Sequence, residues 1–198
     1  MFIDNLKNKF GYSEMYEWSE LFDYSIVPCG RFVAFDNNSQ GKIRLGHTSD
    51  YIIGVTTINT VCTSDDPDEW NGKYLSKEYG DILLQEKNVI NTKEHYDDKE
   101  EFSYITTYND TEIVPIINDD YKKELEYSKR SNRQEWISVN ILGKCIVEDD
   151  GSCMPGKFCT VGENGIAKLT DTSHGMPYVN KWYVIARISD HTILIFFK

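Results

Sequence analysis

The sequence predicts a mainly β protein, a small β-barrel or sandwich built from two similar groups of strands, with a projecting β-hairpin arm and short helices. Three observations support this prediction. The chain contains 13 Tyr, 9 Phe and 4 Trp, and aromatic and β-branched residues favour strands. Its apolar segments are short, and several alternate with polar residues as half-buried strands do. Turn-forming Gly, Asn and Asp residues separate these segments.

The length of 198 residues suits one ordinary domain. We divide the chain into an N-terminal segment at residues 1–22 and a single β-rich domain at residues 23–198, with the hairpin arm inserted at about 82–117. The net charge is −11, so a nucleic acid is not expected as a partner because its phosphates are repelled. No apolar run reaches the ~18–20 residues that span a bilayer, and no signal peptide is visible. A membrane partner is therefore not expected.

The N-terminal segment and the first group of strands come first along the chain. Residues 5–22 fit either a short amphipathic helix or an extended arm, because aromatic residues recur there at helical spacing between glutamates. Strands are then predicted at Arg31–Phe35, Lys42–Leu45 and Tyr51–Thr57. The third of these is almost continuously apolar or β-branched, which predicts burial on both of its faces.

The last third of the chain repeats this pattern. Its strands are predicted at Met154–Phe158, Ile166–Leu169, Tyr183–Ile188 and Thr192–Lys198. We therefore expect a barrel or sandwich built from residues 26–57 and 139–198, in which the two groups share one core. Short helices are expected only near residues 5–22, 66–80 and 119–135.

The most charged part of the chain lies between the two groups and predicts the arm. Apolar residues on both sides flank a polar tip at Lys93–Glu101, which is the pattern of a long hairpin. A two-stranded hairpin is marginally stable in water. We therefore expect a neighbouring subunit to support the arm, the alternative being a floppy surface insertion.

The residues that bind metals and cofactors show no familiar pattern. A zinc site would require Cys145, Cys153 and Cys159 to converge with a histidine, and their spacing matches no common zinc module. The five cysteines are instead interpreted as small buried hydrophobic residues in a reducing compartment. The chain has no phosphate-binding loop, nucleophile elbow or zinc-protease helix motif. We expect neither a metal nor an organic cofactor.

Glu14 and Glu17 are the candidate catalytic residues. Two carboxylates three residues apart share one face of a helix and can couple there. The aromatic setting of Tyr16 and Trp18 would raise a carboxyl pKa, as a general acid requires. The alternative is a solvated acidic face with aromatic anchors beneath it.

Several motifs, in order, carry a resemblance to a known family from about Gly11 to Lys198. They are Ser13–Trp18, Gly30–Val33, Gly41–Arg44, Asp50–Val55, Glu69–Leu75, Glu78–Gly80, Arg133–Trp136, Leu142–Lys144 and Asp149–Cys153. The sequence resembles the intramolecular-chaperone (IMC) autoproteolytic cleavage domain, of glutamic-peptidase type. This domain ends phage tail-spike and neck-appendage proteins and also occurs in giant viruses.

The resemblance implies a C-terminal chaperone domain that forms a homotrimer with itself. Its client would be the preceding spike or fibre chain, which it helps to fold before it cleaves itself off. The family's opening motif implies Glu14 as the catalytic acid, with Glu17 second. The resemblance also implies a location in the host cytoplasm during assembly, with the virion as the alternative.

The chain departs from the family pattern at the bond that is cut. The family cleaves a Ser–Asp bond just ahead of the opening motif, whereas Phe10 and Gly11 stand near that place here. We therefore expect a peptidase that is inactive or already cleaved. Only about ten residues precede the motif, so a recombinant fragment, a free-standing viral gene and a chaperone that has lost cleavage all stay open.

Two further functions remain as alternatives. The first is a non-enzymatic, trimeric structural or decoration protein of a virion or appendage. The second is a carbohydrate-binding tip, which would require an exposed tryptophan near acidic residues. The candidates for that tryptophan are Trp70, Trp136 and Trp182.

Overall fold

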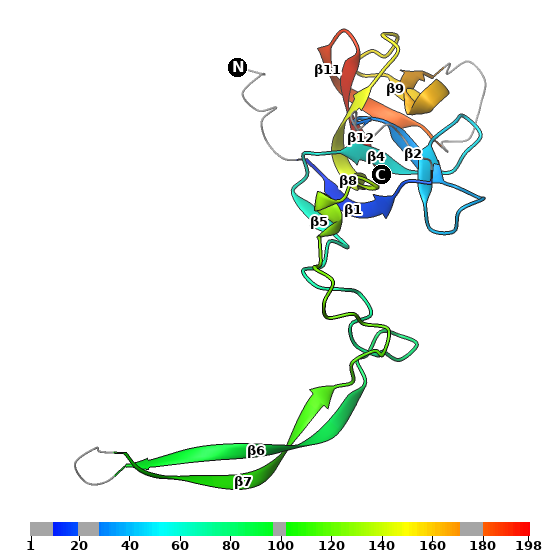
Figure 1. The fold of residues 1–198 in the computed structure, drawn as a ribbon. Coiled ribbons are helices and arrows are strands. Elements are labelled where there is room, and N and C mark those ends of the chain that lie inside the picture. Colours follow the sequence, from blue (N-terminus) through cyan, green and yellow to red (C-terminus); the bar gives the residue numbers. More distant parts are fainter. Residues whose placement is uncertain (1–9, 20–27, 97–101, 171–179) are drawn as a thin grey trace. The chain divides into compact units, whose positions relative to one another are not determined.

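The computed structural model describes residues 10–19, 28–96, 102–170 and 180–198, and it is mainly β as predicted (Figure 1). The strands are β1 (Tyr12–Glu17), β2 (Phe32–Phe35), β3 (Ile43–Leu45), β4 (Ile52–Thr57), β5 (Cys62–Ser64), β6 (Leu84–Tyr96), β7 (Phe102–Pro115), β8 (Trp136–Glu148), β9 (Phe158–Val161), β10 (Ala167–Leu169), β11 (Trp182–Ser189) and β12 (Thr192–Phe197). Two short 3-10 helices are described, η2 (Arg130–Asn132) and η3 (Glu163–Gly165). Among the described residues, no helix has the length and apolar character needed to cross a membrane.

The chain divides into two compact units. The main unit comprises residues 1–67 and 128–198, and the inserted unit comprises residues 68–127. The main unit contains a strongly curled sheet of ten strands in the described residues, in the order β10-β9-β11-β12-β8-β4-β2-β3. Off this path, β1 pairs with β8 and β5 pairs with β1. The inserted unit contains a two-stranded sheet of β6 and β7.

The long strand β8 connects the two predicted groups of strands. On one side, β4 pairs with Ser138–Asn140 and leads to β2 and β3. The other group is joined through β12, which pairs with the second half of β8, Gly143–Glu148. Strand β1 is antiparallel to the first half of β8, Trp136–Leu142.

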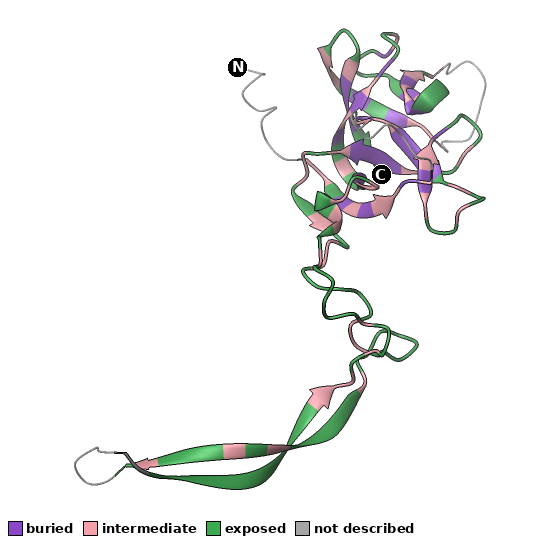
Figure 2. Ribbon diagram, viewed as in Figure 1, coloured by how far each residue is buried: buried purple, intermediate pink, exposed green. Residues whose placement is uncertain are grey.

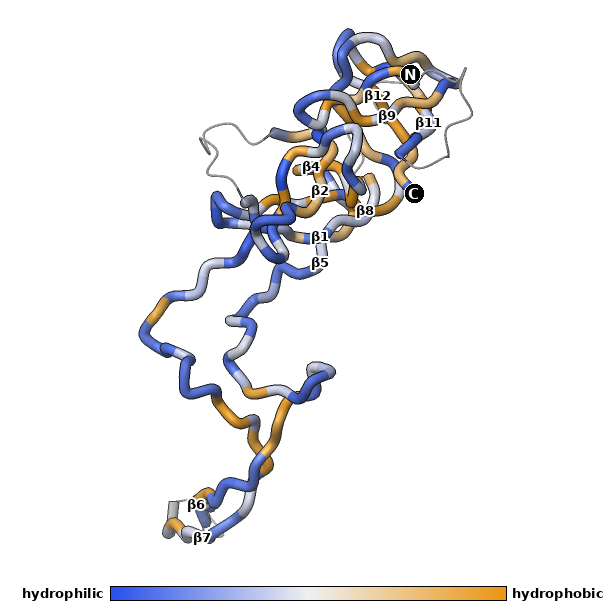
Figure 3. Tube along the Cα trace, turned by 90° about the vertical axis from the view of Figure 1, so that its right-hand side faces the viewer, coloured by the Kyte–Doolittle hydropathy of each residue, from blue (hydrophilic) through white to orange (hydrophobic). Residues whose placement is uncertain are grey.

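One core joins the two groups of strands, as predicted. Its largest cluster of buried side chains includes Phe32 and Val55 from the first group and Val184 and Phe197 from the second. Trp182 connects the two groups, because its ring stacks on Phe32 at 4.3 Å and on Phe197 at 5.4 Å between centroids. Figure 2 shows that buried positions concentrate in these strands, and Figure 3 shows hydrophobic stretches along the same strands.

A second, smaller cluster lies on the opposite face of β2. It contains Trp18, Val33, Ile43, Ile137 and Val139. Because successive residues of a strand point to opposite faces, β2 contributes Val33 to this cluster and its neighbours to the first. The neighbouring strand β4 is also largely buried, which confirms the prediction of a strand covered on both faces.

The inserted unit is built around a long hairpin. β6 and β7 pair antiparallel from Leu84 opposite Pro115 to Tyr96 opposite Phe102. None of the side chains described in these two strands is buried (Figure 2). Isolated bridges between Tyr74 and Ile117 and between Ser76 and Ile82 continue the pairing at its base. The hairpin therefore has no buried core of its own in the part that the structure describes.

The helical alternative for residues 5–22 is wrong where the structure describes that segment. Residues 12–17 form a strand because β8 offers hydrogen-bonding partners along their whole length, and this tertiary pairing outweighs the helical spacing of the aromatic residues. Residues 1–9 and 20–22 of the segment lie outside the described residues, as do residues 26–27 and 97–101.

The predicted helices also differ in place. Residues 66–80 form turns and isolated bridges instead of a helix, while η2 lies within the expected range of 119–135. The helix η3 was not expected. It is part of a tight turn between β9 and β10, in which Asn164 and Gly165 leave the helical region with positive φ angles of 53° and 69°.

Candidate functional site

The two candidate carboxylates lie on β1, and the strand separates them. Residues three apart on a strand point to opposite faces, whereas on a helix they would share one. Glu14 lies on the same face as Tyr16, and Glu17 lies on the other face. The structure therefore does not bring Glu14 and Glu17 together as a coupled pair.

Glu14 lies in an aromatic setting. The Tyr16 hydroxyl donates a hydrogen bond of 2.6 Å to Glu14 Oε2, and the Tyr16 ring meets the edge of Phe35 at 5.8 Å. Burial, together with this hydrogen bond and the negative charge of Glu14, raises the pKa of the Tyr16 hydroxyl well above its usual range. Tyr16 therefore remains a neutral hydrogen-bond donor to Glu14 at physiological pH.

Glu17 has a cationic partner. Its Oε1 lies 2.7 Å from Lys42 Nζ, which comes from the turn leading into β3. Both side chains are about one-third exposed, at 34% and 38%, so solvent screens the pair. The arrangement places Glu17 in a surface ion pair rather than in a dry pocket.

The residue just before β1 is tightly enclosed. Gly11 has a φ angle of +65°, and a Cβ added to it would lie closer than 3.0 Å to atoms of the Asn140 side-chain amide. The Gly11 carbonyl accepts hydrogen bonds of 3.1 Å from the Val61 N–H and from the Thr60 hydroxyl. The conformation at position 11 therefore favours glycine, and the space there excludes a side chain while Asn140 keeps its position.

Sequence reasoning missed a group of hydroxyls around Ser13, which is 3% exposed. The Ser138 hydroxyl donates to Ser13 Oγ at 2.7 Å, and Ser13 Oγ donates to the Cys62 carbonyl at 3.2 Å. The Thr63 hydroxyl lies 3.0 Å from the same oxygen. No local sequence signal could have found this group, because it depends on the pairing of β1 with both β8 and β5.

A cleft of about 430 Å³ lies beside this hydroxyl group. Ser138 and Thr63 line it, together with Met15 of β1 and Trp136 of β8. The Trp136 ring is covered by the guanidinium group of Arg130, 4.1 Å from its centroid. The cleft therefore combines hydroxyls with an aromatic wall on the face of β1 opposite to Glu14.

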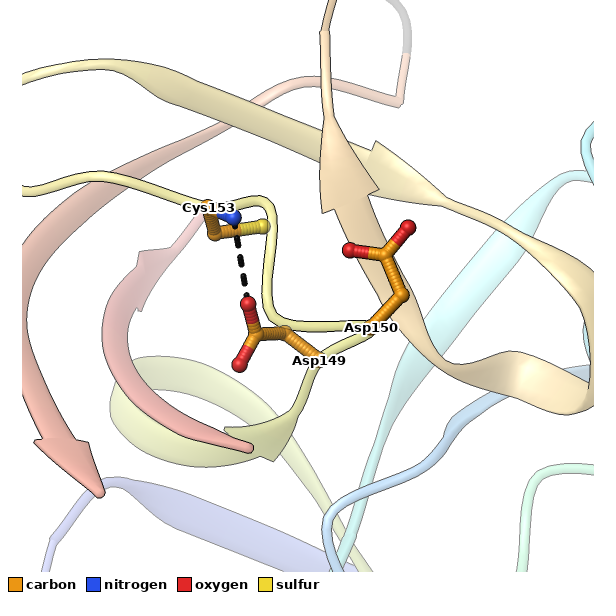
Figure 4. Close-up of side chains that lie close together, drawn as sticks. All are labelled: Asp149, Asp150 and Cys153. Carbon is orange, nitrogen blue, oxygen red and sulfur yellow. Dashed lines mark hydrogen bonds between the residues drawn. The ribbon is translucent and has the colours of Figure 1, made fainter. Parts of the chain in front are cut away.

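One cluster of possible metal ligands occurs in the described residues, at Asp149, Asp150 and Cys153 (Figure 4). The fully buried Asp149 carboxylate is already occupied, because Arg187 contacts both of its oxygens at 3.3 and 3.0 Å. It also accepts hydrogen bonds from the backbone N–H groups of Gly151 and Cys153. Asp149 therefore anchors the turn after β8 to Arg187. The guanidinium group of Arg187 would compete with a metal cation for the Asp149 carboxylate.

The three cysteines considered for zinc are all buried in the core. A hydrogen bond with Cys153 and burial raise the pKa of the Cys159 thiol, and burial raises the pKa of the Cys145 thiol. Metals bind thiolates rather than thiols. These side chains therefore act as hydrophobic core residues.

The three tryptophans considered for carbohydrate binding have different surroundings. Trp182 is 5% exposed and belongs to the core. Trp136 is half-buried beneath Arg130. Trp70 is 37% exposed and meets the edge of Tyr127 in the inserted unit, so it alone of the three presents a sizeable exposed surface.

Fold and site together define a class: a curled β domain that carries an inserted long hairpin and an acidic, aromatic first strand. The same fold occurs in the crystal structure of pre-mature bacteriophage phi29 gene product 12, with a TM-score of 0.66 and 20% identity over 96% of this chain and 22% of that one. A C-terminal fragment of that protein matches with a TM-score of 0.63 and 20% identity, covering 94% of this chain and 99% of the fragment.

The chain belongs to the peptidase G2 family, the IMC autoproteolytic cleavage domain, whose family model matches residues 4–189. This confirms the resemblance seen in the sequence motifs. Related proteins include the preneck appendage protein of Bacillus phage PZA, 27% identical over 82% of this chain, and the pre-neck appendage protein of Bacillus phage B103, 26% identical over 89%. This chain spans only 18% and 19% of the lengths of these two relatives.

Proposed function

We propose that this chain is an assembly domain of a viral appendage, an intramolecular chaperone that forms a homotrimer and assists the folding of a preceding spike or fibre chain. The hairpin carries the proposal. Its strands have 13 and 14 residues, pair along their length and have no buried side chain among those described. Such a hairpin needs a partner to be stable, and family membership supports neighbouring copies and a client chain as those partners.

Chaperone function can be tested with a fusion. The chain is placed behind a β-rich spike segment of a phage appendage protein, and the yield of protease-resistant trimer is measured. The comparison is a fusion in which a short Gly-Ser turn replaces residues 85–114, which leaves the main unit intact. We expect the hairpin deletion to abolish the trimer. Equal yields from both fusions would refute the role of the hairpin.

We further propose that Glu14 is the acid of a self-cleavage site that works inefficiently in this chain. Glu14 is hydrogen-bonded to the neutral Tyr16 hydroxyl, whereas Glu17 is ion-paired with Lys42. Near the position of the family's cut, Gly11 supplies neither a carboxylate nor room for one. Correct placement of the reacting groups supplies much of the rate of such reactions, and here part of that placement is missing.

Intact mass spectrometry tests this proposal. The unmodified chain is expected to stay whole. A variant with Phe10→Ser and Gly11→Asp is made together with Asn140→Gly, which opens the space needed at position 11. Cleavage of that variant should be lost with Glu14→Gln and kept with the surface control Glu163→Gln. Cleavage that survives Glu14→Gln, or efficient cleavage of the unmodified chain, would contradict the proposal.

A second candidate function is that of a non-enzymatic, trimeric virion or appendage component. The glycine at position 11 favours it, because a domain that no longer cleaves stays attached to its client. The two functions predict different destinations. A released chaperone remains in the host cytoplasm after assembly, whereas a retained domain is found by peptide mass spectrometry in purified virions.

A further inference from the structure

The negative charge of the chain is unevenly divided between its two units. The inserted unit, residues 68–127, contains 16 acidic and 7 basic residues and so carries −9 of the net −11. The main unit contains the remaining 16 acidic and 14 basic residues, a net charge of −2. Copies of an evenly charged acidic chain would repel one another. This segregation allows the acidic unit of one copy to approach a basic surface on another.

The main unit carries an exposed row of aromatic side chains across its sheet. Phe158 of β9 lies opposite Tyr183 of β11, and Tyr183 lies opposite Phe196 of β12. Their exposed fractions are 36%, 46% and 44%, and the rings of Phe158 and Tyr183 meet edge to face at 5.7 Å. Single exposed aromatic residues are ordinary on protein surfaces. Three in direct register place exposed aromatic surface on three adjacent strands, which is the kind of patch that interaction sites use; we call it the aromatic row.

Lysines border the aromatic row. Lys144 of β8 lies opposite Phe196. Lys168 of β10 pairs with the residue two positions after Phe158, which faces the same side of the sheet because strand residues alternate. The surface is therefore apolar in its centre and positively charged at its edge.

The hairpin presents a complementary face. Register and alternation place four exposed aliphatic side chains on one side of it, namely Leu84, Ile90, Ile105 and Ile113. Their exposed fractions lie between 53% and 72%. The same side also carries Glu86, opposite Ile113, and Glu94, opposite Ile105. This face, which we call the isoleucine face, is apolar with negative charges.

We propose that the isoleucine face of one copy docks on the aromatic row of the next copy. The inference rests on the proposed homotrimer and names the surfaces that build it. A contact between two different surfaces repeats head to tail, and it closes a ring when the rotation between copies is one-third of a turn. Docking would cover both apolar patches, bring lysines next to glutamates, and supply the partner that the hairpin needs.

Charge reversal tests the docking, with molar mass measured by light scattering. The wild-type chain is expected at three times its mass of 23.0 kDa. Lys144→Glu with Lys168→Glu should reduce this to the mass of one chain, and adding Glu86→Lys and Glu94→Lys should restore the trimer. Lys122→Glu with Lys123→Glu makes the same charge change away from both surfaces and should leave the trimer intact. Circular dichroism verifies that each variant is folded.

Cross-linking between two populations tests whether the contact joins different copies. Both populations carry Cys62→Ser, which removes an exposed thiol; one also carries Phe196→Cys and the other Ile105→Cys. A disulfide-linked pair should form under mild oxidation in the mixture and at a much lower level in either population alone. A monomeric wild-type chain would overturn the trimer and the docking together. A wild-type trimer that resists the lysine reversal and gives no cross-link would overturn the docking alone.

Discussion

Replacing Gly11 by alanine should destabilise the main unit far more than the same change at Gly41. Both glycines have positive φ angles, of +65° and +77°, so both replacements force an L-residue into the left-handed region. They differ in the space around the new methyl group. At Gly11 it would lie closer than 3.0 Å to the Asn140 amide, whereas at Gly41 no heavy atom lies within 4 Å.

The magnitude follows from two contributions. The left-handed conformation costs an L-residue ~1–2 kcal/mol at either position. At Gly11, Asn140 must also move, although it is only 1% exposed and its amide bonds the Lys144 carbonyl at 2.8 Å and the Leu142 N–H at 3.2 Å. Each hydrogen bond is worth ~0.5–1.5 kcal/mol. We therefore expect losses of about 2–5 kcal/mol for Gly11→Ala and about 1–2 kcal/mol for Gly41→Ala.

Thermal unfolding followed by circular dichroism measures this difference. In a chain of this size each kcal/mol lowers the Tm by roughly 2–4 °C, so the two variants should separate by several degrees. Urea unfolding with unchanged m-values would verify that the native state, rather than the unfolded state, is affected. Equal destabilisation by the two variants would refute the close packing of Asn140 against position 11.

Three further predictions concern individual side chains. The pKa of Tyr16 is raised in the folded state, so its contribution to stability is full below about pH 10, the unfolded value, and is lost as the pH rises further. Tyr16→Phe should therefore flatten the fall of the unfolding free energy above about pH 10. An unchanged slope would contradict this. Arg187→Met should cost up to about 3–5 kcal/mol in urea unfolding because it leaves the buried Asp149 carboxylate without its cation, whereas the added change Asp149→Asn should recover part of that loss. Trp182→Ala should cost about 3–5 kcal/mol by opening a cavity between Phe32 and Phe197, and a loss below about 1 kcal/mol would show that Trp182 is not part of the core.

Local patterns were sufficient to predict most strands of the two groups. The exception is Met154–Phe158, where residues 154–157 form a turn that includes Gly156 at a φ of +79° and β9 begins only at Phe158. The predicted strand Tyr51–Thr57 and the observed Ile52–Thr57 differ by one residue, because a turn with Gly46 and Asp50 ends the preceding segment and a nearly continuous apolar run follows. The hairpin was predictable for a similar reason, since its apolar residues flank a charged tip. In both cases the signal lies within a few residues of the element that it specifies.

Strand β1 could not be predicted in this way. Its aromatic residues and glutamates fit the helical period, and the segment becomes a strand only because β8 offers it an edge. The change from helix to strand alters the candidate site, because the repeat of the secondary structure decides which side chains share a face. On a helix Glu14 would face Glu17, whereas on the strand it faces Tyr16.

The rest of the candidate site depends on register between distant segments. Ser13 and Ser138 are 125 residues apart in the sequence and are joined by a hydrogen bond of 2.7 Å. A slip of β1 by one residue against β8 would exchange the faces of every side chain on the strand, so that Ser13 would lose its hydroxyl partners and Glu14 its aromatic setting. The same pairing also brings Gly11 against Asn140. The candidate site therefore depends on the β1–β8 pairing. The acidic motif supplies the side chains, and the pairing decides where each of them lies.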